Sequence, residues 1–151
     1  MSNLSDIKKH NKATAIHAGH PDSWINYTVE LPIAGKIPGK LWLKEHLGLT
    51  GMEISFNLLP PGASIPFMHA HKQNEELYIF ISGEGQMLVD NEIIDVSAGS
   101  AVRISPSAMR CWRNTGKDNL VHLVIQCKEG SLEQWTIEDG LPSTEPPEWP
   151  E

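Results

Sequence analysis

Cysteine is scarce in this chain, since Cys111 and Cys127 are the only two and no CxxC spacing is present. Two cysteines are too few for a disulfide-stapled scaffold, so we expect free thiols in a reducing compartment. The N-terminus lacks the apolar run of a signal peptide. No segment approaches the roughly 18 apolar residues that a membrane-spanning helix needs. These absences favour a cytoplasmic protein.

Basic residues are also few, with 12 Lys and Arg against 19 Asp and Glu and a formal net charge of −7. This balance argues against nucleic acids and anionic membranes as partners. The excess is localised, because residues 129–151 contain seven acidic residues and no Lys or Arg. Residues 1–128 hold equal numbers of acidic and basic side chains. We therefore expect a neutral domain followed by an acidic, Pro-rich tail over residues 131–151.

Long helical segments are missing as well. The 151 residues suit one domain, and 12 Gly and 11 Pro interrupt them often. Turn signals recur about every 8–12 residues, which is typical of an all-β sandwich or barrel. No helix of ordinary length separates the strands, which argues against a parallel βαβ sheet. We predict an N-terminal arm over residues 1–22 and a β-barrel domain over residues 23–130.

Individual elements follow from the local patterns. Residues 24–31 are predicted to form a strand, and residues 40–47 a short helix that Gly48 ends. From residue 52 to residue 58, apolar and polar side chains alternate, which indicates a half-buried strand. Further strands are predicted over residues 76–81, on both sides of the Asp90-Asn91 turn, and in the final LVHLVIQ segment.

The residues that carry chemistry are His69, His71 and Glu76. The two histidines are spaced i, i+2, so on a strand their side chains point to the same side. If Lys72-Gln73-Asn74 forms the turn, Glu76 opens the next strand and its carboxylate reaches both rings. Two imidazoles and one carboxylate are a ligand set for iron, manganese, nickel or zinc, and the set does not choose among them.

In this region the sequence resembles the cupin superfamily. The first cupin motif is matched by the glycines, histidines and glutamate at Gly62, His69, His71, Glu76 and Gly83, with one extra residue after Gly62. The second motif is matched at Gly99, Pro106, Ala108 and Asn114. The resemblance covers about residues 52–126. It implies a double-stranded β-helix, or jelly-roll barrel, with a pocket inside, and a homodimer.

The resemblance also implies a metal held by His69, His71, Glu76 and a fourth ligand from the second motif, but no histidine stands there. Arg110 and Cys111 occupy the candidate positions. Arg110 can point inward and pair with Glu76, leaving no metal, or reach past the metal and grip an anionic ligand. Alternatively, a one-residue shift turns Cys111 inward as a thiolate ligand. We rank three protein ligands, or no metal, above Cys111.

Other side chains are assigned by their strand positions. Tyr78, Phe80 and Trp112, with Arg110, are predicted to contact a ligand, and a core role is the alternative for the three aromatic residues. Glu75 is predicted to be a solvated charge. We predict that His122, opposite an apolar strand face, is exposed or at a dimer interface. Leu77, Ile79 and Ile81, on the second face of their strand, indicate cover by another layer or a dimer partner.

Two functions remain open from the sequence. In the first, the barrel binds a divalent metal and a small molecule, which is anionic if Arg110 contacts it, and acts as an oxygenase, isomerase or decarboxylase. In the second, no metal is needed, and Arg110 with the histidine pair binds a ligand for a sensor or storage role. The fold alone does not choose between an enzyme and a binding protein.

Overall fold

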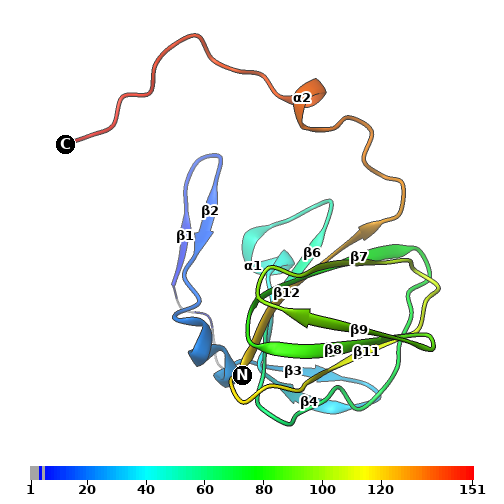
Figure 1. Ribbon diagram of the computed structural model, residues 1–151. Helices are drawn as coiled ribbons and strands as arrows, with labels where there is room; N and C mark the ends of the chain where they lie inside the picture. Colours follow the sequence, from blue (N-terminus) through cyan, green and yellow to red (C-terminus); the bar gives the residue numbers. More distant parts are fainter. Residues whose placement is uncertain (1–3, 5) are drawn as a thin grey trace.

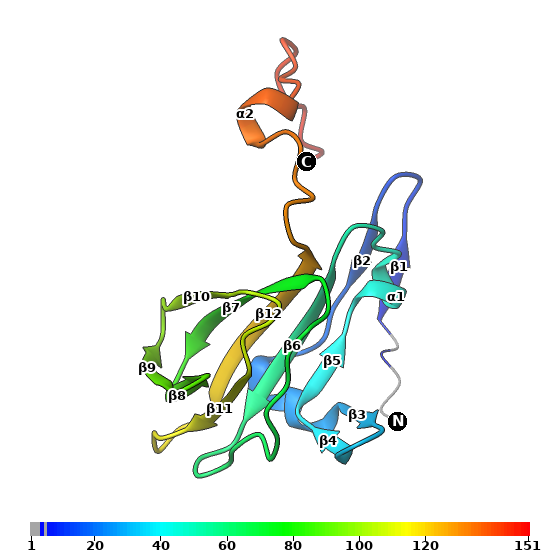
Figure 2. The same ribbon diagram turned by 90° about the vertical axis from the view of Figure 1, so that its right-hand side faces the viewer.

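Antiparallel strands form most of the ordered structure in the computed structural model, which describes residue 4 and residues 6–151. The larger sheet has five strands in the spatial order β10 (Ala101–Ile104), β7 (Asn74–Ser82), β12 (Leu120–Lys128), β6 (Glu53–Leu59) and β5 (Lys40–Trp42). Figure 2 shows them side by side. The smaller sheet contains β11 (Arg110–Asn114), β8 (Glu84–Val89) and β9 (Glu92–Ser97).

The main core lies between the two sheets. It is built from buried apolar side chains of both, namely Tyr78, Phe80, Met87, Val96, Ile104, Trp112, Leu120 and Val124. Removing this apolar surface from water is the main force that holds the sheets together. The arrangement is a jelly-roll barrel, and the predicted all-β fold class is confirmed.

The first N-terminal elements are β1 (Ile7–Lys9), β2 (Thr14–Ile16) and the 3-10 helix η1 (Pro21–Asn26), and they cover the outer face of β5, β6 and β12. The hairpin of β3 (Thr28–Leu31) and β4 (Gly35–Pro38) lies apart from β1 and β2 (Figure 1), and its connecting turn lines a cavity on the inner side of the sheet. Trp24 of η1 stacks on Phe56 of β6, with ring centroids 4.4 Å apart. Both rings belong to a second apolar cluster, which also contains Leu4, Ala18, Leu58 and Val121. In the predicted 1–22 arm, residues 1–3 and 5 lie outside the described residues.

Two predicted elements are wrong in part. The predicted 24–31 strand begins only at Thr28, because Pro21 and the His20 ring, which accepts from the Asp22 amide, start a 3-10 helix instead. The predicted 40–47 helix is split into β5 and α1 (Lys44–Leu47). Residues 40–42 pair with β6, and pairing across the sheet overrides their local helical spacing. Gly48 does end the helix, with a left-handed φ of 69°.

The side-chain alternation along β6 has an unexpected orientation. Phe56 and Leu58 face the N-terminal layer, whereas Ser55 and Asn57 face the barrel interior and are buried. Cross-strand pairing aligns Lys40 with Asn57, and Asn57 with His122. A polar row therefore runs across the inner face of the larger sheet.

His122 corrects our prediction of an exposed or interface residue. Its side chain is 1% exposed and lies inside the barrel, stacked on Phe80 with centroids 5.3 Å apart. The Trp112 ring meets the His122 ring edge-on, with centroids 5.6 Å apart. The apolar neighbours of His122 pack outward under the N-terminal layer, and the strand's alternation therefore turns the histidine inward.

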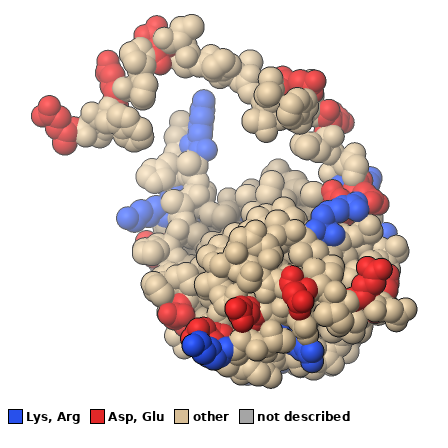
Figure 3. Space-filling model, viewed as in Figure 1, with Lys and Arg blue, Asp and Glu red and all other residues tan. Residues whose placement is uncertain are grey.

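The C-terminal segment extends away from the barrel (Figures 1 and 2). It contains the short helix α2 (Thr136–Asp139), and every residue from 131 to 151 is exposed. Figure 3 shows its acidic side chains in red, with no blue among them. Large apolar side chains are exposed here as well, namely Leu132, Trp135, Ile137, Leu141 and Trp149. Among the described residues, no helix is long and apolar enough to span a membrane.

Candidate metal centre

The start of β7 and the loop before it bring His69, His71 and Glu76 together. The His69 backbone exchanges two hydrogen bonds with Arg110, with N···O distances of 3.1 and 2.9 Å. The His71 amide donates to the Pro106 carbonyl at 2.8 Å. These bonds tie the histidine loop to β11 and to the loop before it, which limits the movement of both histidines.

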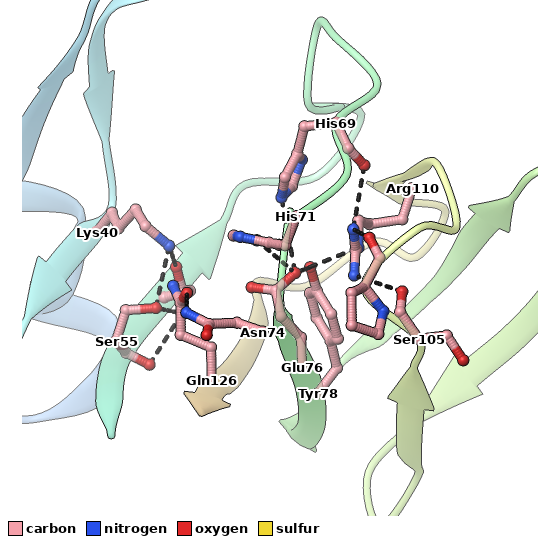
Figure 4. A network of polar contacts seen from close by, with 12 residues as sticks. Lys40, Ser55, His69, His71, Asn74, Glu76, Tyr78, Ser105, Arg110 and Gln126 are labelled. Carbon is pink, nitrogen blue, oxygen red and sulfur yellow. Dashed lines mark hydrogen bonds and ion pairs between the residues drawn. The ribbon is translucent and has the colours of Figure 1, made fainter. Parts of the chain in front are cut away.

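One carboxylate oxygen is the centre of the cluster (Figure 4). The Nε2 atoms of His69 and His71 lie 3.6 and 3.3 Å from Glu76 Oε1. The three candidate ligand atoms all lie within 4.8 Å of one another. Glu76 is 4% exposed, whereas the histidine side chains are 29% and 24% exposed. The sequence therefore identified three side chains that do meet, and the open side of the cluster is formed by the imidazoles.

Arg110 points inward, as two of the three alternatives from the sequence required. Its Nε lies 3.2 Å from Glu76 Oε1, and the side chain is fully buried. Nη1 donates to the carbonyl oxygens of His69 and Pro106 at 3.3 and 3.5 Å, and Nη2 donates to the Ser105 carbonyl at 3.2 Å. The guanidinium is thus engaged on each of its nitrogens by groups of the protein itself.

Tyr78 is the fourth group at the same oxygen. Its hydroxyl donates to Glu76 Oε1 at 2.8 Å. Burial raises the pKa of this phenol far above its usual value, and the negative charge of Glu76 raises it further. Tyr78 therefore stays protonated and acts as a hydrogen-bond donor to the carboxylate.

The charges of the cluster follow from these contacts. Burial by itself raises the pKa of the Glu76 carboxyl, but contacts with His69 and Tyr78, together with the nearby His71 and Arg110, lower it below its usual value. Burial lowers the pKa of His71, whereas the negative charge of Glu76 raises it in part. Arg110 and His69 lower it further. An ionised carboxylate and a neutral imidazole are the forms that bind a metal.

Cys111 faces away from the cluster. Along β11, Arg110, Trp112 and Asn114 are buried and turned inward, while Cys111 is half-buried on the opposite side. The strand therefore does not make the one-residue shift that would have turned the thiol inward. Burial raises the pKa of Cys111, which further disfavours a thiolate.

The prediction of a solvated Glu75 is correct only in part. Its carboxylate lies 2.7 Å from the Arg103 guanidinium, which also binds Glu129 at 2.7 Å. Because Glu75 and Glu76 are consecutive on β7, they point to opposite faces of the sheet. Glu75 thus belongs to a surface ion-pair network and Glu76 to the interior.

The predicted ligand contacts occupy a deeper position than the histidines. Tyr78, Phe80 and Trp112 are buried in the main core, with the Tyr78 and Trp112 rings 5.1 Å apart. Trp112 also meets the His69 ring edge-on at 6.4 Å. Tyr78 and Arg110 contact Glu76 directly, and the contact of all four residues with a ligand stays a prediction.

A cavity of about 280 Å³ opens beside the cluster. His69, His71 and Glu76 line one side, and Lys40, Ser55 and Gln126 line the inner face of the larger sheet. Its apolar wall is formed by Leu31, Pro32, Ile33, Trp42, Phe67 and Val124. Sequence reasoning missed Lys40. The strand pairing that aligns it with Asn57 was hidden by the helical spacing of residues 40–47.

Comparison with known proteins agrees with this geometry. The family described as Cupin domain matches residues 56–126, the segment from β6 to β12 that contains all three candidate ligands. An uncharacterised protein of Methanocaldococcus jannaschii is 34% identical over 67 residues, which are 44% of this chain. That match spans about half, 51%, of the relative's length.

Solved structures show the same fold. A cupin protein from Bacteroides fragilis is 44% identical, covers 69% of this chain and 88% of its own, and has a TM-score of 0.65. A structure described as a putative sugar phosphate isomerase, from Acidithiobacillus ferrooxidans, is 28% identical (TM-score 0.54; 59% of this chain, 58% of that chain). One described as a predicted oxalate decarboxylase, from Thermotoga maritima, is 22% identical, covers 68% and 90%, and shares the fold (TM-score 0.57). On the Bacteroides match and the domain match together, this chain belongs to the cupin superfamily.

Proposed function

We propose that this protein binds a divalent metal through His69, His71 and Glu76 and acts on a small molecule held in the adjoining cavity. The observation that carries the proposal is the convergence of both imidazole Nε2 atoms on one ionised, buried carboxylate. The reaction class is a metal-dependent oxygenation, isomerisation or decarboxylation.

The donor set fits such an ion. Two ligands about 2.1 Å from one metal are roughly 3.4 Å apart when the angle between them is tetrahedral. The observed distances of 3.3 and 3.6 Å from Glu76 Oε1 match that spacing. In addition, His71 Nε2 is buried, and its 3.3 Å contact with Glu76 Oε1 lacks the geometry of a hydrogen bond. A metal would supply Lewis acidity or a site for oxygen at the cavity wall.

The chain's own residues would then hold and orient the centre. Tyr78 and Arg110 fix the Glu76 carboxylate from behind, which keeps one oxygen aimed at the histidine rings. The backbone bonds of His69 and His71 limit the movement of their loop. The apolar wall of the cavity excludes water from the bound molecule, which strengthens polar interactions there.

A second candidate function is a metal-free binding protein. Glu76 Oε1 already receives the Tyr78 hydroxyl at 2.8 Å and lies 3.2 Å from Arg110 Nε, so the carboxylate is charge-compensated without a metal. In that case the histidines would contact the ligand directly. A sensor or storage role would follow.

Metal content separates the two candidates. The full chain is purified without chelators or a nickel column, dialysed against iron, manganese, nickel and zinc in turn, and analysed by plasma mass spectrometry. We expect close to one equivalent of one metal, with loss in His71→Ala. The control is His10→Ala, an exposed histidine on the N-terminal hairpin. Less than about a tenth of an equivalent of every metal would favour the metal-free function.

We also propose that two copies associate through the outer face of β7. Leu77 and Ile79 are half-buried there, and Ile81 is 48% exposed. Covering a row of apolar side chains with a second apolar surface removes them from water, which lowers the free energy of the pair of chains. Light scattering after gel filtration should give twice the chain mass, and Ile79→Lys should give a monomer; a wild-type monomer would refute the association.

A further inference from the structure

Lys40 is a cation inside the barrel without a partner of opposite charge. Its Nζ donates to Ser55 Oγ at 3.0 Å and to Asn57 Oδ1 at 2.8 Å, and both of these side chains are buried. No carboxylate of the described residues forms an ion pair with it. An ammonium has three donor hydrogens, and two neutral acceptors leave one of them free. Lys40 also lines the cavity of the metal centre.

The two carboxylates that line the cavity already have partners within the protein. Glu76 is paired with Arg110, on the opposite side of the carboxylate from Lys40 (Figure 4). Glu53 stands on the cavity wall, but its Oε1 accepts from the backbone amides of Leu43, Lys44 and Ile54 at 3.0–3.2 Å. Of the charged side chains that line the cavity, Lys40 is therefore the one with a hydrogen-bond donor left for a ligand.

Burial makes this charge expensive to keep. It lowers the pKa of Lys40 to about 8, although the carboxylates of Glu76 and Glu53 raise it in part. At neutral pH most molecules are still protonated. A lysine that the chain places in a desolvated position without a counter-ion is stabilised when an anion enters beside it.

We infer that the cavity binds a small organic monocarboxylate, with its carboxylate on the Lys40 ammonium and its apolar body against the wall that includes Trp42, Phe67 and Val124. The one free ammonium donor of Lys40 matches a single carboxylate group. The volume of about 280 Å³ is at the small end of ligand pockets, and most of the surface area that lines the cavity is apolar. Arg110 does not take this role, since each of its nitrogens is engaged within the protein. This inference deepens the proposed function, because it names the ligand class for the same cavity.

The test compares benzoate with benzamide, which has the same shape but no charge. Isothermal titration calorimetry on the metal-free full chain at pH 7 should show benzoate binding at least tenfold more tightly than benzamide. In Lys40→Met the tenfold preference should disappear. Lys44→Met is the matched control, because it removes the same charge from an exposed position at the start of α1, and it should keep the preference.

Several results would overturn the inference. Equal affinity of the wild-type chain for benzoate and benzamide would do so without any variant, and so would an unchanged preference in Lys40→Met. Tighter binding of inorganic phosphate than of benzoate would refute the carboxylate class. Metal binding is measured separately on the same proteins. Lys40→Met should lose the benzoate preference and keep the metal content of the wild-type chain, so that failure of one proposal is distinguishable from failure of the other.

Discussion

Replacement of Arg110 by histidine should convert a weak metal site into a stronger one. The residue lies beside His69 across two backbone hydrogen bonds, and its Nε is 3.2 Å from Glu76 Oε1. An ion bound at Glu76 would therefore be about 5 Å from the guanidinium. At an effective dielectric constant of 20, a single charge repels a divalent ion at that distance by about 7 kcal/mol.

The measurable gain is smaller than this repulsion, because Glu76 and solvent compensate part of it. If one third remains, about 2 kcal/mol, Arg110→His should lower the Kd of zinc or manganese about 30-fold. Competition with a chelator of known affinity measures the change. Arg110→Met removes the charge without adding a ligand, so the difference between the two variants isolates the contribution of the new imidazole.

The same replacement should destabilise the metal-free protein. Arg110 is fully buried and contacts Glu76 and three backbone carbonyl groups, so its loss leaves a buried carboxylate without its cation. Breaking such a pair costs about 3–5 kcal/mol. Urea unfolding should show that loss without metal and partial recovery with it. Arg113→His, on the exposed side of the same strand, should change neither quantity. Unchanged metal affinity in both Arg110 variants would refute the electrostatic reasoning.

Three further predictions concern the fold. Burial lowers the pKa of His122 from 6.5 to about 3. As the pH falls between these values, the unfolded chain takes up a proton that the folded chain does not. The free energy of unfolding should therefore decrease there by up to about 1.4 kcal/mol per pH unit. His122→Phe should flatten this part of the pH profile of urea unfolding, and an unchanged slope would exclude His122 as its source. Gly83→Ala should lower the free energy of unfolding by about 2–4 kcal/mol, because Gly83 has a φ of 86° and a Cβ there would overlap the Asn119 carbonyl oxygen. Gly62→Ala is the control and should lower it by about 1 kcal/mol, because Gly62 has a φ of 75° but lies in open space. Deletion of residues 131–151 should leave the melting temperature within about 2 °C in calorimetry, since the whole segment is exposed, and a larger loss would show that the segment packs on the barrel.

The candidate ligands could be predicted from the sequence because their spacing is short. His69, His71 and Glu76 lie within eight residues, and strand alternation together with one turn is enough to bring them together. Turn residues at regular intervals likewise indicated an all-β barrel, which the two-sheet structure confirms. These features depend on local backbone geometry, which a sequence expresses directly.

Tertiary structure decided which face of each strand points into the barrel. The apolar side of β6 packs under the N-terminal layer, and as a result Ser55, Asn57 and His122 face the barrel interior. A sequence shows that two faces differ, but which of two apolar layers covers a face depends on segments far apart along the chain. Lys40 reaches the cavity only because β5 pairs with β6, and this long-range pairing overrides the helical spacing of its own segment.

Arg110 shows the same division most clearly. The sequence determined that a cation, and not a histidine, stands at the fourth-ligand position. It left open whether that cation would pair with Glu76, reach a ligand or give way to Cys111. The register of β11 against β8 and the bridge to His69 decided the question, because they turn Arg110 inward and Cys111 outward. Hydrogen bonds between distant strands fix such a register, and no short stretch of sequence contains them.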